Sequence, residues 1–445
     1  MKRPPTLPIA RLAAALAVTL PLSAGTLPAA ADEPGRTGPD NAITDVPGIQ
    51  VGHYTDRENI TGTTALVIPK GATAGSDARG GAPGTINTDV LDPVALEPTV
   101  HGLLLSGGSV MGLSAYSGVV QYLREQGLGM QFGGKPVPVV PGAIVFDLGQ
   151  GADADDRIEK TPGFDAGYRA AKAAKPGRVE MGSVGAGTGT GTGGPPGIRL
   201  KGGVGTASIQ LGDGLVVGAL VVLNSAGKVY NEAAGCELYT LYMEVGNEFG
   251  GTRRPPRGCK TATSTPQHAP RSGPTDPHLD ENTTIGVVAT NAKLTVAQAE
   301  KLAQVAHDGL ARAIRPAHTM GDGDTTFGLS TRTAAAPDGA AFGALLDAAA
   351  STFSRATVHA ALAATPLGGR QPYCQVFAGA CDRRHTPATN GSGASQPLAF
   401  RPASGTSIPP SATTSGYAAL ITIPALIGAG TWTLRRRRRA GLARR

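Results

Sequence analysis

The sequence predicts a single layered α/β domain, and three features of its hydrophobic pattern carry that prediction. Two nearly continuous runs of β-branched residues and leucine, 215–223 and 284–290, are typical of buried strands. An amphipathic helical pattern follows the second run from Thr295 onwards. Between residues 45 and 378, only the segment 250–281 has the composition of a linker. Strands and helices mixed in this way form layers around a shared core.

The first half of the chain predicts a strand, a glycine turn and a helix in direct succession. Residues 100–105 are apolar and end in the turn 106–109 (SGGS), and residues 110–125 follow with a helical pattern that stops at Gly127. The apolar positions of this helix are Leu113, Val120 and Leu123.

The second half predicts two more helices. Thr295 and Gln298 have the spacing of a capping box, and Pro316 closes the helical pattern that starts there. Residues 339–364 predict a second, longer helix. The segment 250–281 is rich in Arg, Pro, Ser and Thr and has no apolar periodicity, which is typical of a functional or disordered loop.

The positive charge of the chain is concentrated at its two ends. The 445 residues include 40 Lys and Arg against 33 Asp and Glu, a formal net charge of +7. Ten of the basic residues lie in residues 1–31 and 435–445, which contain no acidic residue, so 30 basic residues face 33 acidic ones in between. A clustered basic face for phosphates is not expected, and we predict no nucleic-acid partner.

The N-terminus has the pattern of a secretory signal peptide, residues 1–31. Three basic residues precede the apolar stretch 12–22, and Ala29 to Ala31 supply small residues at the cleavage site.

The C-terminus predicts an anchor. Residues 384–416 have the Pro-, Ser- and Thr-rich composition of a disordered stalk. Residues 417–434 carry no charge, enough for one transmembrane helix, and the Arg-rich tail 435–445 is expected in the cytoplasm. We therefore expect an exported protein on the extracellular face of the membrane or, if the anchor is later cut, in the cell wall.

Four cysteines in an exported chain predict two disulfides. Three pairings are possible, and the local one joins Cys236 to Cys259 and Cys374 to Cys381. A zinc site is the weaker interpretation, because the spacings are not of the C-x₂-C type and no histidine pair accompanies them. We predict no metal and no cofactor.

Three sequence motifs resemble known functional motifs, but the residues around each of them do not fit. Met111 stands where a nucleophile elbow around Ser109 requires glycine. Residues 189–194 (GTGTGG) fit a dinucleotide-binding string, but two prolines follow in place of a helix, which favours a surface loop or a pocket lining. An acidic cluster lacks the glycine and distal glutamate of a calcium loop and is expected on a solvated face: Asp153, Asp155 and Asp156.

The junction of Asn282 and Thr283 is the predicted place of the chemistry. Thr283 starts a buried strand directly after the 250–281 loop. If the Asn282–Thr283 bond is cut, Thr283 gains an α-amine with a reference pKa of about 7.7–8.0, able to accept the proton of its own hydroxyl. Asp322 and Asp324 lie on a glycine-flanked turn downstream and are candidates to orient that residue.

Several ordered motifs resemble the P1 family of N-terminal-nucleophile aminopeptidases, peptidase family S58. This family includes the L-aminopeptidase/D-esterase enzymes, the β-peptidyl aminopeptidases and the nylon-oligomer hydrolases. The motifs are residues 41–53 (NAITDVPGIQVGH), 101–109 (HGLLLSGGS), 201–208 (KGGVGTAS), 282–285 (NTTI) and 288–290 (VAT).

The resemblance implies a fold and a maturation step. It implies an αββα sandwich whose precursor cuts itself before Thr283, leaving an N-terminal piece, 32–282, and a C-terminal piece, 283–383, that stay together. It also implies that processed pairs assemble into a homo-oligomer and that the substrate is a small peptide or amide.

The resemblance also implies roles for single residues. Thr283 takes the place of the nucleophile, and Asn224 takes that of an asparagine that holds the oxyanion. Lys201, followed by Gly202, matches a lysine that lines the pocket.

Three further positions are assigned in the same way. Asp322 and Asp324 match the pair that orients the nucleophile. Phe146 stands near the place of a tyrosine found in some members, and phenylalanine lacks that tyrosine's hydrogen bond. Threonine with two aspartates is more similar to the nylon-oligomer hydrolases than to the serine aminopeptidases.

The predicted function is therefore a self-processing amide hydrolase of the aminopeptidase type. Two alternatives remain open: an acyltransferase of the ornithine acetyltransferase type, which has a similar architecture, and an inactive surface protein with the same fold.

Overall fold

The computed structural model describes residues 35–96, 99–148, 160–196, 198–260 and 282–381. The predicted signal peptide, stalk, transmembrane segment and basic tail lie outside these ranges, as do Asp153, Asp155 and Asp156 and most of the 250–281 loop. Within them, no helix is both long and apolar enough to cross a membrane.

Nine strands form one hydrogen-bonded array. Their order is β10 (Gly203–Gly212), β11 (Leu215–Leu223), β14 (Ile285–Thr290), β15 (Thr325–Ser330), β2 (Thr61–Ala78), β4 (Val100–Ser106), β7 (Gly142–Ile144) and β3 (Thr85–Ile86), with β1 (Gln50–Asp56) also on β2. The pairs β14–β15 and β4–β7 are parallel, and the other pairs are antiparallel.

The long strand β2 divides this array into two facing sheets. Its residues 73–78 pair with β15, and its residues 63–67 pair with β4. The ladder to β4 is interrupted between Val67 and Ala72, where Pro69 has no N–H to donate. One sheet therefore continues into the other through a single strand.

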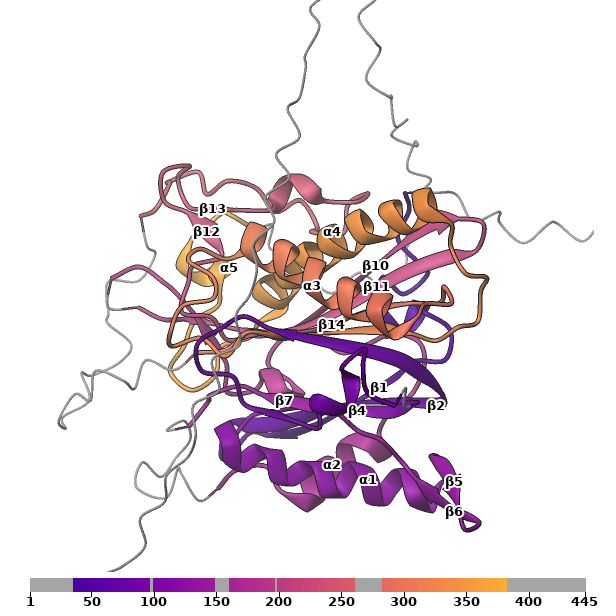
Figure 1. Cartoon of the computed structure of the whole chain (residues 1–445). Helices are drawn as coiled ribbons and strands as arrows, with labels where there is room; N and C mark the ends of the chain where they lie inside the picture. The colour runs from indigo at the N-terminus through magenta and orange to yellow at the C-terminus, as the bar shows by residue number, and fades with distance from the viewer. Residues whose placement is uncertain (1–34, 97–98, 149–159, 197, 261–281, 382–445) are drawn as a thin grey trace, which may run out of the picture. The chain divides into compact units, whose positions relative to one another are not determined.

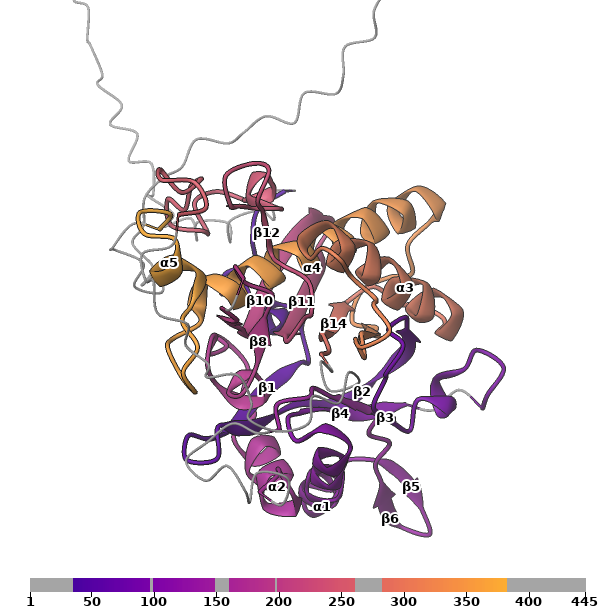
Figure 2. The ribbon, with the colours of Figure 1, turned by 90° about the vertical axis from the view of Figure 1, so that its left-hand side faces the viewer.

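Helices cover the outer face of each sheet, giving four layers in the order α, β, β, α (Figures 1 and 2). The helices α3 (Val296–Ala313) and α4 (Gly339–Ala363) lie on the sheet of β10, β11 and β14. The helices α1 (Tyr116–Glu125) and α2 (Phe164–Lys172) lie on the sheet of β1, β2 and β4. The predicted layered α/β domain is confirmed.

Burial on both faces explains the continuous apolar runs in the sequence. In β11, Val221 packs toward α3 and α4, whereas Leu220 packs between the sheets. In β2, Ala65 packs toward α1 and α2, whereas Leu66 packs between the sheets. Because alternate residues of a strand point to opposite faces, a strand in an inner layer buries side chains on both faces and is mostly apolar.

Shorter elements complete the described chain. They are the strands β5 (Met130–Phe132), β6 (Lys135–Val137), β8 (Gly191–Thr192), β9 (Leu200–Lys201), β12 (Tyr230–Asn231) and β13 (Glu237–Leu238), the helix α5 (Tyr373–Val376), and 3₁₀ helices at Ile43–Asp45, Asp89–Leu91, Ser109–Ala115, Gly185–Gly187 and Leu241–Met243.

Most predicted elements lie where the pattern placed them, and the capping box of Thr295 and Gln298 is formed. The helix predicted over 110–125 is the exception, because its first part is the 3₁₀ helix Ser109–Ala115 and α1 begins only at Tyr116. Ser109 has φ +51°, and Gly112 approaches the carbonyl of Gly107 so closely that a Cβ would lie 1.8 Å from it. Because the turn constrains the backbone at these positions, the α-helix begins several residues later than predicted.

The residues that α1 buries also differ from the prediction. Val119 and Leu123 are fully buried, whereas Val120 and Leu113 are only partly buried. The 3₁₀ start rotates the helix relative to the face that a continuous α-helix would present.

The segment 189–194 is not the surface loop that was one of the two expectations for it. Thr190 and Thr192 are fully buried, and β8 within this run pairs with β9. Both local disulfides, Cys236–Cys259 and Cys374–Cys381, are present.

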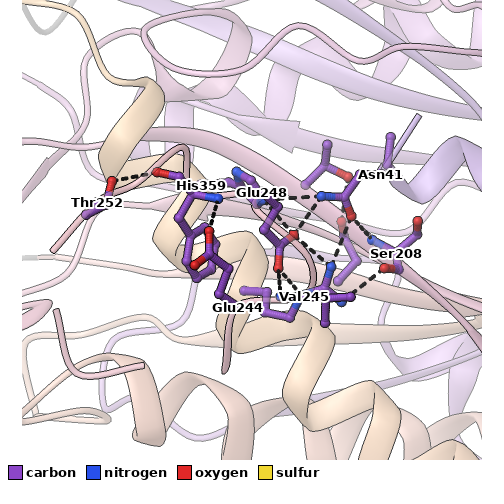
Figure 3. Close-up of polar contacts among 12 residues, drawn as sticks. Asn41, Ser208, Glu244, Val245, Glu248, Thr252 and His359 are labelled. Carbon is purple, nitrogen blue, oxygen red and sulfur yellow. Dashed lines mark hydrogen bonds and ion pairs between the residues drawn. The ribbon is translucent and has the colours of Figure 1, made fainter. Parts of the chain in front are cut away.

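A buried ion-pair cluster fastens α4 to the segment 244–249 (Figure 3). Arg355 donates from Nε and Nη2 to both carboxylate oxygens of Glu248, at 2.6 and 2.7 Å. His359 Nε2 lies 3.0 Å from Glu248 Oε2, and Asn41 donates to the same oxygen at 2.6 Å. Burial opposes ionisation, but the hydrogen bonds from His359 and Arg355 outweigh it and hold the pKa of Glu248 well below its usual range. We call Asn41, Glu248, Arg355 and His359 the Glu248 cluster.

Candidate active site

Three adjacent strands bring the candidate residues together at one edge of a sheet. Asn224 follows the end of β11, Thr283 lies just before β14, and Asp324 lies just before β15. Because β11 runs antiparallel to β14 and β15 runs parallel to it, the end of the first strand meets the starts of the other two. The Thr283 N–H donates to the Asn224 carbonyl at 2.6 Å, which closes the group.

The Thr283 hydroxyl lies against the peptide bond that precedes it. Its Oγ1 donates to the carbonyl oxygen of Asn282 at 2.5 Å, and the Gly323 N–H donates to the same oxygen at 2.8 Å. Both Asn282 and Thr283 are buried. The site thus combines a hydroxyl, an adjacent carbonyl and a backbone donor aimed at that carbonyl oxygen.

The two aspartates hold the backbone around Thr283. Asp324 Oδ1 accepts from the Thr284 N–H at 2.7 Å. Asp322 Oδ1 accepts from the Ala226 N–H at 3.1 Å, and its Oδ2 accepts from Thr319. In the hydrogen bonds of the described residues, neither carboxylate contacts the Thr283 hydroxyl. Their observed action is therefore on the chain that flanks the nucleophile candidate.

The side-chain amide of Asn224 forms its hydrogen bonds with groups other than the Asn282 carbonyl. Its Oδ1 accepts from the Gly191 N–H at 2.9 Å, and its Nδ2 donates to the Phe146 carbonyl at 2.8 Å. Phe146 meets the site through its backbone. In this uncut arrangement, the backbone donor at the Asn282 oxygen is Gly323, and Asn224 contacts Thr283 through its main chain.

Lys201 is buried beneath the 187–191 segment. Its Nζ donates to the carbonyls of Gly187 and Gly202 at 2.8 and 3.0 Å. Burial lowers the pKa of Lys201 well below its usual range, Arg370 lowers it further, and Asp147 opposes the shift. Gly202 has no room for a side chain, since a Cβ would lie 2.0 Å from the Leu223 carbonyl.

Sequence reasoning missed three contributors. Arg199 Nη2 donates to the Asn282 side chain, and Gly323 supplies the backbone donor already described. Asp147 accepts from the Gly108 N–H at 2.6 Å and from Thr61 at 2.8 Å, and burial raises its pKa to about 6. Only Gly323 had a sequence signal, its place between the two aspartates.

A cavity of about 260 Å³ lies beside the start of β15. Its lining includes Asp77, Asp89, Asp92, Glu300 and Thr325. Thr283 is not part of this lining, so the cavity is not assigned to the reaction.

The chain is similar to known proteins over most of its length. Residues 41–374 match peptidase family S58. The chain belongs to peptidase family S58. A protein named uncharacterized aminopeptidase in Mycobacterium leprae is 40% identical over 366 residues, 77% of this chain and 96% of that protein. A 6-aminohexanoate-oligomer endohydrolase of Kocuria sp. is 31% identical over 66% of this chain and 76% of its own length.

Solved structures support the fold of this S58 member. A Burkholderia sp. beta-aminopeptidase has a TM-score of 0.55 at 23% identity and covers 76% of this chain and 92% of its own. The L-aminopeptidase D-Ala-esterase/amidase from Ochrobactrum anthropi, described as a variant of the Ntn-hydrolase fold, has a TM-score of 0.54 at 24% identity and covers 75% and 89%. The S58 chain has a mixed α/β fold of the Ntn-hydrolase kind and is an amide hydrolase of the aminopeptidase type.

Proposed function

We propose that Thr283 is the nucleophile of two reactions, the self-cleavage of the precursor and the hydrolysis of amide substrates. The observation that carries the proposal is the Thr283 Oγ1 resting 2.5 Å from the carbonyl oxygen of Asn282 while Gly323 donates to that oxygen. A hydroxyl adjacent to a carbonyl whose oxygen already has a backbone donor supplies two of the groups that acyl transfer uses.

Self-cleavage proceeds by an acyl shift. The Thr283 hydroxyl attacks the carbonyl carbon of Asn282, and the Gly323 N–H stabilises the charge that develops on the oxygen. The C–N bond then breaks, its nitrogen takes up a proton, and an ester joins Asn282 to Thr283 Oγ1. The amine of Thr283 is free from this point. Water then hydrolyses the ester, which releases the carboxylate of Asn282 and restores the Thr283 hydroxyl.

The new amine remains beside its hydroxyl. The Asn224 carbonyl, which accepts from the Thr283 N–H in the uncut chain, is placed to keep holding that nitrogen. An α-amine has a reference pKa of about 7.7–8.0, so near neutral pH it can take the hydroxyl proton as Thr283 attacks a substrate carbonyl. The α-amine passes that proton to the leaving nitrogen as the substrate C–N bond breaks and an ester forms on Thr283 Oγ1. Water then hydrolyses the ester, which releases the acid and restores the hydroxyl. In this proposal the side chain of Asn224 lies at the oxyanion, and Lys201 lines the substrate pocket.

The test is gel electrophoresis of purified protein followed by amino-terminal sequencing. Two bands are expected, the smaller one beginning at Thr283. Each disulfide joins cysteines on the same side of the cut, so reductant should not change the number of bands. A fragment that starts at any other residue, or one band that becomes two only with reductant, contradicts the proposal.

The position of Gly323 predicts a strong effect of adding one methyl group. A Cβ there would lie 2.5 Å from the Ala82 carbonyl and 2.8 Å from Thr283 Oγ1. Gly323→Ala should therefore displace the hydroxyl and slow self-cleavage by roughly 10²-fold or more, as loss of one oxyanion donor does. Gly343→Ala, at a helical glycine with open space around it, is the matched control. Equal cleavage rates in both variants, followed on gels over time, would remove Gly323 from the mechanism.

We propose a small amide with a free amino group as the substrate, and a homo-oligomer of processed pairs as the active form. Relatives named aminopeptidase and 6-aminohexanoate-oligomer endohydrolase support peptides and oligoamides as the two classes to compare. Hydrolysis of amino-acid anilides and of 6-aminohexanoate oligomers by the processed protein separates them.

The location proposed for the protein is the outer face of the membrane or the cell wall. Its support is the sequence of the two ends, 1–31 and 417–434. Deletion of residues 411–445 should move the protein into the medium, since it removes the 18 uncharged residues of the predicted anchor. A truncated protein that stays in the membrane fraction contradicts this topology.

A further inference from the structure

His318 holds one oxygen of Asp324 in place by two contacts. Its backbone N–H donates to Asp324 Oδ2 at 3.0 Å, and its ring nitrogen Nδ1 lies 2.8 Å from the same oxygen. An ionised carboxylate only accepts hydrogen bonds, so Nδ1 carries the proton in this pair. Asp324 has no freedom to turn, because its other oxygen accepts from Thr284.

The surroundings of His318 fix the ring in this position. His318 has φ +56°, a left-handed conformation that is uncommon for a residue with a side chain. Its ring meets the ring of His307 edge to face at a centroid distance of 4.7 Å. His307 Nε2 in turn lies 3.0 Å from the backbone oxygen of Asp77 in β2. The imidazole is therefore oriented by both the loop conformation and α3.

We propose that His318 is a positioning residue for the nucleophile, acting through Asp324. Two hydrogen bonds connect His318 to the nucleophile segment. His318 holds Asp324 Oδ2, and Asp324 Oδ1 accepts from the backbone N–H of Thr284, the residue after Thr283. This inference rests on the proposed role of Thr283. It adds a residue that neither touches the Thr283 hydroxyl in these contacts nor belongs to the motifs that define the resemblance.

The expected effect of removing the ring is on rate. His318→Ala should slow self-cleavage and lower kcat by roughly 10- to 100-fold, the rate equivalent of one hydrogen bond to a charged group. KM should stay within about twofold, because the ring orients the nucleophile and does not bind the substrate. His318→Asn should restore most of the rate, since asparagine tolerates positive φ and its amide can donate from nearly the same place as Nδ1.

The experiment measures cleavage of the precursor over time and the kcat and KM of the processed protein for His318→Ala, His318→Asn and wild type. Asp213→Ala is the matched control, because Asp213 also has positive φ, +50°, and is exposed in the turn between β10 and β11. Thermal melting of each variant accompanies the kinetics.

Each outcome decides the proposal. A slow His318→Ala, a restored His318→Asn and an unchanged Asp213→Ala support it. Wild-type rates in His318→Ala, or an asparagine variant as slow as the alanine variant, overturn it. If the Thr283→Ala precursor still cuts itself, the proposed function fails; if it stays whole while His318→Ala cuts at the wild-type rate, only the role of His318 fails.

Discussion

Thr283→Ala is expected to remain a single chain and to lose amide hydrolysis by roughly 10⁴-fold or more, because the variant has no hydroxyl to form either ester. Thr283→Ser keeps a hydroxyl on the same carbon and should retain part of both reactions. Gel electrophoresis follows self-cleavage, and an anilide assay follows turnover.

The neighbouring residue supplies a close control for this prediction. The Thr284 hydroxyl is fully buried and has no hydrogen-bond partner among the described residues. Thr284→Val replaces it with a methyl group of similar size and keeps the backbone N–H that Asp324 accepts. This variant should cut itself and turn over normally, since an unpartnered buried hydroxyl contributes nothing favourable.

Maturation and turnover can also be separated. Co-expression of residues 32–282 and 283–445 as two chains bypasses the cut, so a Thr283→Ala change in the second chain tests turnover alone. If the two co-expressed chains still hydrolyse amides with alanine at position 283, another group must be the nucleophile, and the proposal is wrong.

Glu248→Ala is expected to lower the free energy of unfolding by about 3–5 kcal/mol, the usual loss when one partner of a buried ion pair is removed. Arg355 would remain with its charge buried, because its side chain is only 1% exposed. Chemical denaturation in the Thr283→Ala background measures this on an uncut chain. In the processed protein Glu248 and Arg355 belong to different pieces, so the same variant should promote their separation on gel filtration.

Two comparisons make this prediction specific. Glu244 lies in the same segment and accepts from the Phe249 N–H, but it is only half-buried and forms none of the ion pairs found among the described residues. Glu244→Ala should cost about 1 kcal/mol, the contribution of one such hydrogen bond. A Glu248 variant no less stable than the Glu244 variant would show that the ion pair is not needed. Combining Glu248→Leu with Arg355→Leu should recover much of the loss, since both buried charges are gone.

The pH dependence of stability has a definite sign. The folded-state pKa of Glu248 is held below the unfolded value, so its contribution is complete above the ordinary carboxylate range. It is lost as the pH falls from about 4 toward the folded-state pKa. The slope of stability against pH in this acidic range should be shallower in Glu248→Ala than in wild type.

Local patterns were sufficient for most elements of the fold. The run 215–223 coincides with β11, and Thr295 caps α3 as its spacing with Gln298 predicted. Such signals need only neighbouring residues, because strand alternation, helical periodicity and capping are properties of a short stretch of backbone. The 3₁₀ helix at residues 109–115 was not predicted, because its geometry depends on the close approach of Gly112 to Gly107, which hydrophobic periodicity does not encode.

The sequence by itself also predicted Thr283 and the turn of Asp322 and Asp324 as the candidate residues for the chemistry, since each has a composition and context visible locally. Only the tertiary structure decided how they meet. Pairing of β11, β14 and β15 places Asn224, Thr283 and Asp324 at one edge, gives Gly323 the contact with the Asn282 oxygen, and uses Asn41 of the N-terminal motif in the Glu248 cluster. These contacts join segments distant in the chain, so their partners are set by strand register and layer packing, which a sequence pattern does not contain.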